Sequence, residues 1–333
     1  MRSRPPLSPP ARHRTRALVA ALALAVAVSG CSLFDDDEPG ATSPTTSTTA
    51  PITTTTAPET SVELLEAGAA PLAPLRLEFR EGDTTTVAIT VELQVDQTSD
   101  GERQRLVTPA VREVATLTVD GVVDGEAMVS LAFTEARVVR TDSDLSDEEA
   151  AAIDADLAAL EGVRGSGRIT DLGELTSFRY DLPDDLDPGV RTTLERTRGE
   201  LDALALPLPA EPVGVGARWR ATTTSRLGGF PLRQETTFEL TALDDGVVTY
   251  TAEVRQSAED QDVALDGLAE GTTAHLVSSR VEGTASGTMQ LASLAATVRS
   301  SLAGTQVIDL RSDGAPDRRL SQALTLAVAV EPA

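Results

Sequence analysis

The sequence contains neither lysine nor asparagine, and it has only one cysteine and two histidines. Without lysine there can be no Schiff-base lysine, no phosphate-binding P-loop lysine and no Ser-x-x-Lys nucleophile. Without asparagine there is no N-glycosylation sequon. The single cysteine, Cys31, has no disulfide partner and no second thiol for a metal site. These absences exclude several large classes of enzyme before any motif is considered.

Histidine chemistry is restricted in the same way. His13 lies in the N-terminal segment, so His275 is the only histidine in the rest of the chain. A Ser-His-Asp triad of the Gly-x-Ser-x-Gly type has no match, because the nearest string begins with Arg164 instead of glycine. One histidine cannot form a zinc site alone, and the acidic run from Asp142 lacks the glycine and glutamate of an EF-hand loop. The sequence predicts a non-enzymatic protein with no metal and no cofactor. It favours the interpretation of His275 as an ordinary surface histidine.

The charge balance is acidic, with a formal net charge of −24. The first thirty residues carry five of the arginines and no acid, so their removal would leave the chain still more negative. Such a chain is not attracted to nucleic acid or to an anionic lipid surface by electrostatics. We therefore expect no nucleic-acid partner. A sugar-binding cleft is not indicated either, because such clefts use aromatic platforms and only one tryptophan and two tyrosines are present.

The N-terminus has the form of a secretory signal peptide. Its arginines precede an apolar run, residues 17–28, which is shorter than the ~20 residues that a membrane-spanning helix needs. Val28, Ser29 and Gly30 then stand before Cys31, as in the lipobox that a bacterial signal peptidase recognises. The sequence predicts a signal peptide over residues 1–30 and lipidation of Cys31, which would anchor the protein on the extracytoplasmic face of the cell membrane. The alternative is an ordinary signal peptide that ends at a cysteine by chance.

Two further regions follow Cys31. Residues 31–61 are acidic and then rich in Thr, Ser and Pro, a composition that predicts a disordered tether, with O-glycosylation as a further reading of the threonines. Residues 62–333 are expected to form a single β-rich domain. Its clearest strand is 87–95, where apolar and polar residues alternate strictly. Other predicted strands are 103–108, 115–119, 127–133, 167–169, 175–182, 219–224, 234–243, 247–254 and a short one around His275.

Two helices interrupt the strands. Ser146 and Glu149 form a capping box before apolar residues at helical spacing, and this helix is expected to stop at Gly162. The second helix is predicted over 187–204, starting at an Asp-Pro pair. Segments 115–131 and 237–254 are loosely alike, which suggests an internal duplication, although chance similarity between hairpins is the alternative. The predicted fold class is mainly β: a large curved antiparallel sheet, either a half-barrel or an open barrel, covered by about two helices.

The most distinctive string runs from residue 206 to residue 219, LPLPAEPVGVGARW. It resembles a Pro-Val-x-Val-Gly-x-x-Trp motif of an uncharacterised family of actinobacterial lipoproteins, for which the resemblance implies no activity. We interpret Pro212, Gly214, Gly216 and Trp219 as a structural motif in which Trp219 plugs a core. In architecture alone, the chain is also similar to lipid-carrier lipoproteins of the LppX, LprG and LolA types, which implies a hollow half-barrel that holds lipid.

Three functions compete at this stage. The first is a membrane-anchored lipoprotein that binds or carries a lipid or another apolar ligand in its concave sheet. The second is a scaffold module of the cell envelope that docks a protein partner without using a pocket. The third, an enzyme with scattered carboxylates, has no motif in its favour.

Overall fold

A computed structural model describes residues 59–99, 101–107, 109–140, 145–182, 206–227, 230–263, 268, 271–312 and 316–333. Fourteen strands in these segments belong to one antiparallel sheet, with the order β1-β8-β9-β10-β12-β13-β14-β2-β4-β5-β6-β7, while β3 pairs with β2 and β11 with β12. The bounds are β1 (Glu59–Glu66), β2 (Thr84–Ser99), β3 (Glu102–Val107), β4 (Val111–Val123), β5 (Glu126–Val138), α1 (Asp147–Leu157), β6 (Arg164–Ile169), β7 (Leu175–Asp181), β8 (Arg218–Leu227), β9 (Phe230–Asp244), β10 (Val247–Ala258), β11 (Gln261–Val263), β12 (Thr272–Gln290), β13 (Ala296–Ser312) and β14 (Arg318–Pro332).

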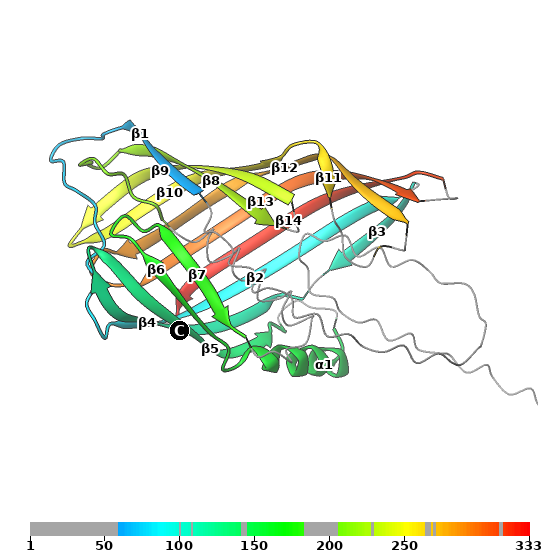
Figure 1. Ribbon diagram of the computed structural model, residues 1–333, viewed down its shortest axis with the longest axis horizontal. Coiled ribbons are helices and arrows are strands. Elements are labelled where there is room, and N and C mark those ends of the chain that lie inside the picture. The colour runs from blue at the N-terminus through cyan, green and yellow to red at the C-terminus, as the bar shows by residue number, and fades with distance from the viewer. Residues whose placement is uncertain are drawn as a thin grey trace, which may run out of the picture.

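The sheet is open and curved, which confirms the predicted fold class. Its two edges are β1 and β7, and between them the strands curl into a long trough (Figure 1). Only one α-helix, α1, occurs in the described segments, and the second predicted helix, 187–204, lies outside them. The sheet begins at Glu59, slightly before the predicted domain start at residue 62, because Val62 and Leu64 of β1 pack against the core.

Helix α1 begins as its sequence predicts. The hydroxyl of Ser146 accepts a hydrogen bond from the backbone N–H of Glu149, and the Glu149 carboxylate accepts one from the backbone N–H of Ser146. Ile153, Leu157 and Leu160 are buried against β5 and its neighbours, the last of them in a 3-10 turn over residues 158–160. The capping box and the apolar spacing therefore place α1 against the β4–β7 part of the sheet.

The two parts of the sheet are joined through one pair of strands in its middle, β14 and β2. β14, at the end of the sequence, lies beside β2, with Leu324 opposite Val95 and Val330 opposite Ile89. β8 to β13 lie on one side of this pair, and β4 to β7 lie on the other. The two longest strands, β12 and β13, follow β14 in the sheet, with β13 paired to β14 and β12 paired to β13.

Two close hairpins turn on Asp-Gly pairs. Asp124 and Gly125 join β4 to β5, and Asp245 and Gly246 join β9 to β10, all four with positive φ. This conformation is that of a type I′ turn, whose twist matches the twist of the flanking strands. Segments 115–131 and 237–254 thus share this turn, and a duplication of the two halves stays a prediction.

Glycines let the central strands approach closely where the sheet bends. A Cβ atom at Gly283 of β12 would collide with the carbonyl oxygen of Ser301 on β13. A Cβ at Gly304 of β13 would collide in turn with the carbonyl oxygen of Arg280 on β12. Glycine inside a strand marks such close backbone approaches and bends. We infer that these glycines permit the curvature of the trough.

Candidate functional site

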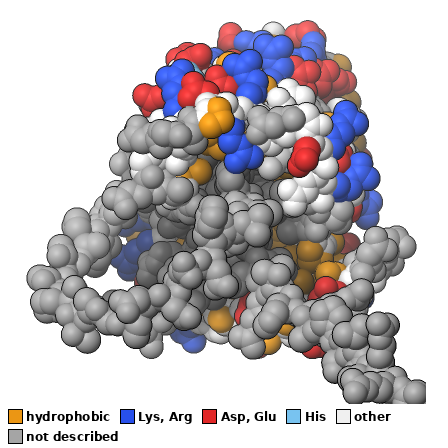
Figure 2. Space-filling model, turned by 90° about the vertical axis from the view of Figure 1, so that its right-hand side faces the viewer, with side chains coloured by type: hydrophobic (Ala, Val, Ile, Leu, Met, Phe, Trp, Pro, Cys, Tyr) orange, Lys and Arg blue, Asp and Glu red, His pale blue; other side chains and the backbone are white. Residues whose placement is uncertain are grey.

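The inner face of the trough is lined by aliphatic side chains from alternating positions. β2 contributes Val87, Ile89, Val91, Leu93 and Val95, and the register places the last four beside valine or leucine residues of β14. β13 and β12 continue the lining with Val298, Leu302 and Val281. Polar and charged residues occupy the outward positions, as the strict alternation of 87–95 predicts. Figure 2, which views the molecule from the end that carries β3 and β11, shows acidic and basic side chains mixed over the upper, outward surface.

One end of the trough is closed by a packed core. Leu75, Leu77, Leu206 and Leu208 lie in two loop segments that reach the tip of the β6–β7 hairpin, where Leu77 N–H donates to the Asp171 carbonyl at 2.8 Å. Leu208 N–H donates to the carbonyl of the neighbouring hairpin residue, also at 2.8 Å. These loops pack on β8, β9 and β10 as well, so they bridge the two sides of the sheet.

The middle of the trough is less completely covered. Val91 and Leu93 of β2 and Leu326 of β14 are only half-buried, although the apolar residues around them are almost wholly buried. Ala285 and Ser300, small residues on the inner side of β12 and β13, are also half-buried. Apolar surface therefore remains accessible in the middle of an otherwise packed face.

A row of amide and hydroxyl side chains crosses this apolar face, and we call it the amide row. It comprises Gln97 on β2, Gln322 on β14, Gln306 on β13 and Ser279 on β12, which are register partners in that order. Gln322 donates from Nε2 to Oε1 of Gln97 at 3.2 Å. Nearby, Gln256 of β10 donates to Gln234 of β9 at 2.7 Å. All four members of the row are at least nine-tenths buried.

Two members of the amide row have no protein partner. Both polar atoms of the Gln306 side chain and the Oγ of Ser279 are buried without a hydrogen bond. Gln306 is wholly inaccessible to solvent. A buried polar group without a partner costs about 1–3 kcal/mol, so such groups are rare in folded proteins. The row therefore offers unused donors and acceptors within an apolar surface.

The Pro-Val-x-Val-Gly-x-x-Trp string is part of the packed end. Trp219 is wholly buried, stacks on Phe238 with ring centroids 5.4 Å apart, and donates from Nε1 to the Pro207 carbonyl at 2.8 Å. Gly214 passes so close to the carbonyl of Ala69 that a Cβ would collide with it.

The other two members of the string are nearer the surface. Gly216 has φ +84°, and Pro212 is exposed. The string thus joins β8 to the loop near β1. None of its four motif residues belongs to the amide row.

Tyr250 completes an aromatic group with Trp219 and Phe238. Its ring meets Phe238 edge-on at 5.7 Å, and burial raises the pKa of its hydroxyl to about 12. The phenol therefore stays neutral at any physiological pH. We assign this group to the core and not to a ligand platform.

His275 lies on the outer side of β12 between two carboxylates. Its Nδ1 is 2.8 Å from the carboxylate of Asp262, in the middle of β11, and its Nε2 is 2.8 Å from that of Asp260, the residue before β11. The hydrogen bond with Asp262 raises the pKa of His275, and the charge of Asp260 adds to the effect. Among the residues that the structure describes, no group of three or more His, Cys, Asp or Glu could hold a metal ion.

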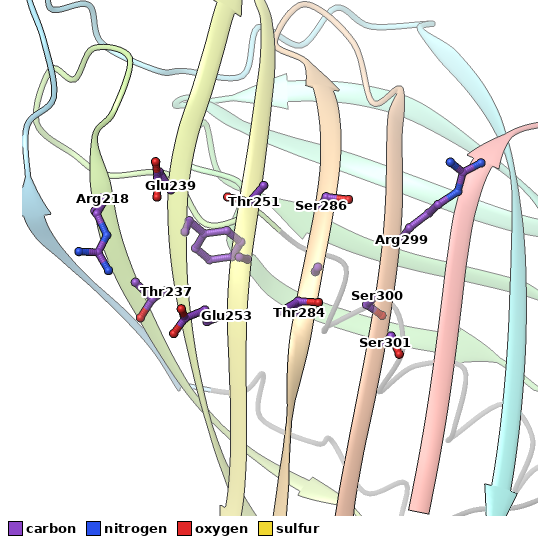
Figure 3. A pocket seen from close by; sticks show the side chains of 13 residues that line it. Arg218, Thr237, Glu239, Thr251, Glu253, Thr284, Ser286, Arg299, Ser300 and Ser301 are labelled. Carbon is purple, nitrogen blue, oxygen red and sulfur yellow. The ribbon is translucent and has the colours of Figure 1, made fainter.

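A shallow cleft of about 500 Å³ lies on the outer face of β8 to β13 (Figure 3). Its lining carries both charges, with Arg218 and Glu239 at one side, Arg299 at the other, and hydroxyl side chains such as Thr251 and Ser286 between them. Most of its lining residues hold outward positions, and Phe238, Ala252, Ala285 and Ser300, which also line it, hold inward ones. Nothing in its composition points to one kind of ligand.

The predicted processing and lipidation residues, Val28, Ser29, Gly30 and Cys31, lie outside the described residues, as does the tether up to residue 58. In the segments that the structure describes, no helix has the length and apolar character needed to cross a membrane.

The sequence analysis did not single out the amide row, although its signal is present. Gln97 follows the alternating valines and leucines of β2 in the same phase, so a glutamine stands where the pattern demands an apolar residue. Gln306 and Gln322 occupy corresponding positions in β13 and β14. A polar residue in an inward phase on three separate strands could have been recognised as a row only once the strand order was known.

Comparison with known proteins adds little to this description. No protein-family model matches the chain, and no curated protein matches it. Among solved structures, an outer membrane channel from Pseudomonas putida F1 aligns with 77% of this chain and 97% of its own, at 9% identity and a TM-score of 0.13. A likeness at this level supports no argument about fold or function, so the functional assignment depends on the trough itself.

Proposed function

We propose that this protein is a lipoprotein anchored through Cys31 to the extracytoplasmic face of the cell membrane, where its trough holds a lipid or another apolar ligand. The observation that carries the proposal is the half-buried aliphatic surface at Val91, Leu93 and Leu326, in the middle of the inner face. Exposed apolar area costs about 25 cal/mol per Å², so an apolar ligand that covers this surface gains the corresponding free energy. The lipobox before Cys31 supports a location beside a source of lipid.

The first test is purification of the full chain from membranes in mild detergent, followed by solvent extraction and mass spectrometry of the extract. We expect one class of apolar molecule at a near-stoichiometric amount. The matched variants are Ala285→Leu, which adds bulk to the inner face of β12, and Ala303→Leu, which adds the same bulk to the outer face of β13. The inner substitution should reduce the bound lipid several-fold, and the outer one should leave it unchanged.

The opposite results would contradict the proposal. A preparation that never carries lipid above the detergent background would exclude the apolar site. Equal lipid in the two variants would place any bound lipid away from the trough. If crosslinking in cells instead recovered one dominant protein partner and both variants retained it, the scaffold function would replace the lipid-binding one.

The anchor is tested separately. Cys31→Ala removes the only thiol, and we expect it to move the protein from the membrane to the soluble fraction while the circular dichroism of the sheet stays unchanged. Ser32→Ala, at the adjacent position, is the matched control and should stay in the membrane fraction. Retention of the Cys31→Ala variant in the membrane would contradict lipid anchoring.

A further inference from the structure

The inference concerns the chemistry of the bound ligand, and it rests on the proposed function. An amide side chain presents two N–H donors and a carbonyl acceptor, and a serine hydroxyl can donate and accept. In Gln306 and Ser279 all of these are buried and unused by the protein. The two residues are register partners on the β12–β13 pair, so their unused groups lie next to each other on the inner face.

The surroundings define the charge of a matching group. The inner-face register partners of Gln306 and Ser279 are glutamine and alanine side chains, Gln322 on one side and Ala258 on the other. None of these carries a charge that could balance an ion. Transfer of an unpaired ion into such a site is far more costly than transfer of a neutral polar group. The group that fits is therefore neutral, and it hydrogen-bonds through a carbonyl or a hydroxyl.

The two sides of the amide row define what stands next to that group. On one side the inner face is formed by Val95, Leu302 and Leu324, which cluster with Val281. On the other side it is formed by Leu276, Ile308 and Leu320. A polar group in the row would thus have apolar protein surface in both directions along the strands. A headgroup at the end of a lipid does not match this arrangement, whereas a linkage inside a hydrocarbon chain does.

We propose that Gln306 and Ser279 bind the neutral carbonyl linkage, an ester or an amide, of a ligand whose hydrocarbon chains extend on both sides of it. The linkage carbonyl accepts from Nε2 of Gln306 or from the hydroxyl of Ser279. The chains cover the aliphatic clusters on either side. The neighbouring pair Gln97 and Gln322 is joined by a hydrogen bond within the row.

The test is a competition between two defined probes, decyl decanoate and heneicosane. They have the same number of chain atoms, and only the first contains an ester. The full chain, stripped of lipid, is incubated with equal amounts of both in detergent micelles, and the bound ratio is measured by mass spectrometry after gel filtration. We expect the bound ratio of ester to alkane to be about fivefold higher in the wild type than in Gln306→Leu, which corresponds to one net hydrogen bond of ordinary strength.

The variants separate recognition from folding. Gln306→Leu keeps the size of the side chain and removes its polar atoms, while Ser279→Ala removes only a hydroxyl and should shift the ratio in the same direction. Thr305→Val, an outward residue next to Gln306 on β13, is the matched control and should keep the wild-type ratio. Thermal unfolding of each variant shows that the sheet is intact.

Three outcomes overturn the inference. If wild type and Gln306→Leu bind both probes in the same ratio, the row does not recognise a carbonyl, its unused groups are met by water only, and the apolar site remains. If Thr305→Val changes the ratio as much as Gln306→Leu, the effect is not specific to the inner face. If neither probe binds to any form, the proposed function fails together with the inference.

Discussion

Trp219→Phe tests whether the packed end of the trough is a structural core. The substitution keeps the stacking on Phe238, at 5.4 Å between ring centroids, but it removes the Nε1 donor whose bond to the Pro207 carbonyl is 2.8 Å long. That carbonyl is then left buried without its partner, at a cost of about 1–3 kcal/mol. The smaller ring also leaves a void among wholly buried neighbours such as Leu208 and Leu240, which adds about 1–2 kcal/mol.

The expected loss is therefore about 2–5 kcal/mol, a large part of the 5–15 kcal/mol that stabilises a typical domain. The assay is urea unfolding followed by circular dichroism, because the variant lacks the chain's only tryptophan and its fluorescence. Leu72→Ala is the control on the adjoining loop, and since Leu72 is 48% exposed we expect a change within about 0.5 kcal/mol. A loss below about 1 kcal/mol for Trp219→Phe would refute the assignment of Trp219 to the core.

Two further predictions concern local interactions. The raised pKa of His275 means that its charged form is favoured in the folded state. The interaction with Asp262 and Asp260 therefore stabilises the β11 region fully below the unfolded pKa of ~6.5, and this contribution is lost as the pH rises through the higher folded pKa. An NMR titration of the imidazole should give a midpoint above 6.5 that falls in Asp262→Asn, and a midpoint at or below 6.5 in the wild type would contradict this reasoning. Ser146→Ala removes the capping hydroxyl of α1 and should cost about 1 kcal/mol in thermal or urea unfolding, whereas an unchanged midpoint would mean that α1 adds nothing to global stability.

The strands that were predictable from sequence are those with large inward residues. The segment 87–95 alternates between large aliphatic and polar side chains, and it is the centre of β2. The capping box of α1 was predictable because Ser146 and Glu149 are near neighbours in sequence and their interaction is local. The Asp-Gly turns were predictable for the same reason, since their backbone conformation depends on the turn residues themselves.

The longest strand was the hardest to recognise. β12 extends over nineteen residues, but its inward positions include Ser279, Gly283, Ala285 and Gly287, so its apolar alternation is weak. Small inward residues occur there because β12 and β13 approach each other closely at the bend of the sheet. This cause is tertiary, and no local pattern expresses it. The same is true of the amide row, whose members Gln97 and Gln306 are brought together only by the pairing of β14 with β2.

The pairing of β14 with β2 also has a consequence for how the chain reaches its folded state. Gln97 and Gln322, which bond across this pair, are 225 residues apart in sequence, and β1 joins β8 across more than half that distance. Contacts so distant in sequence must overcome a large loop-closure entropy before they contribute, and chains rich in them fold slowly. The inner face cannot be complete until β14, the last strand in the sequence, has paired with β2 and β13. Any ligand held in the trough is therefore acquired by a finished chain and not during its synthesis.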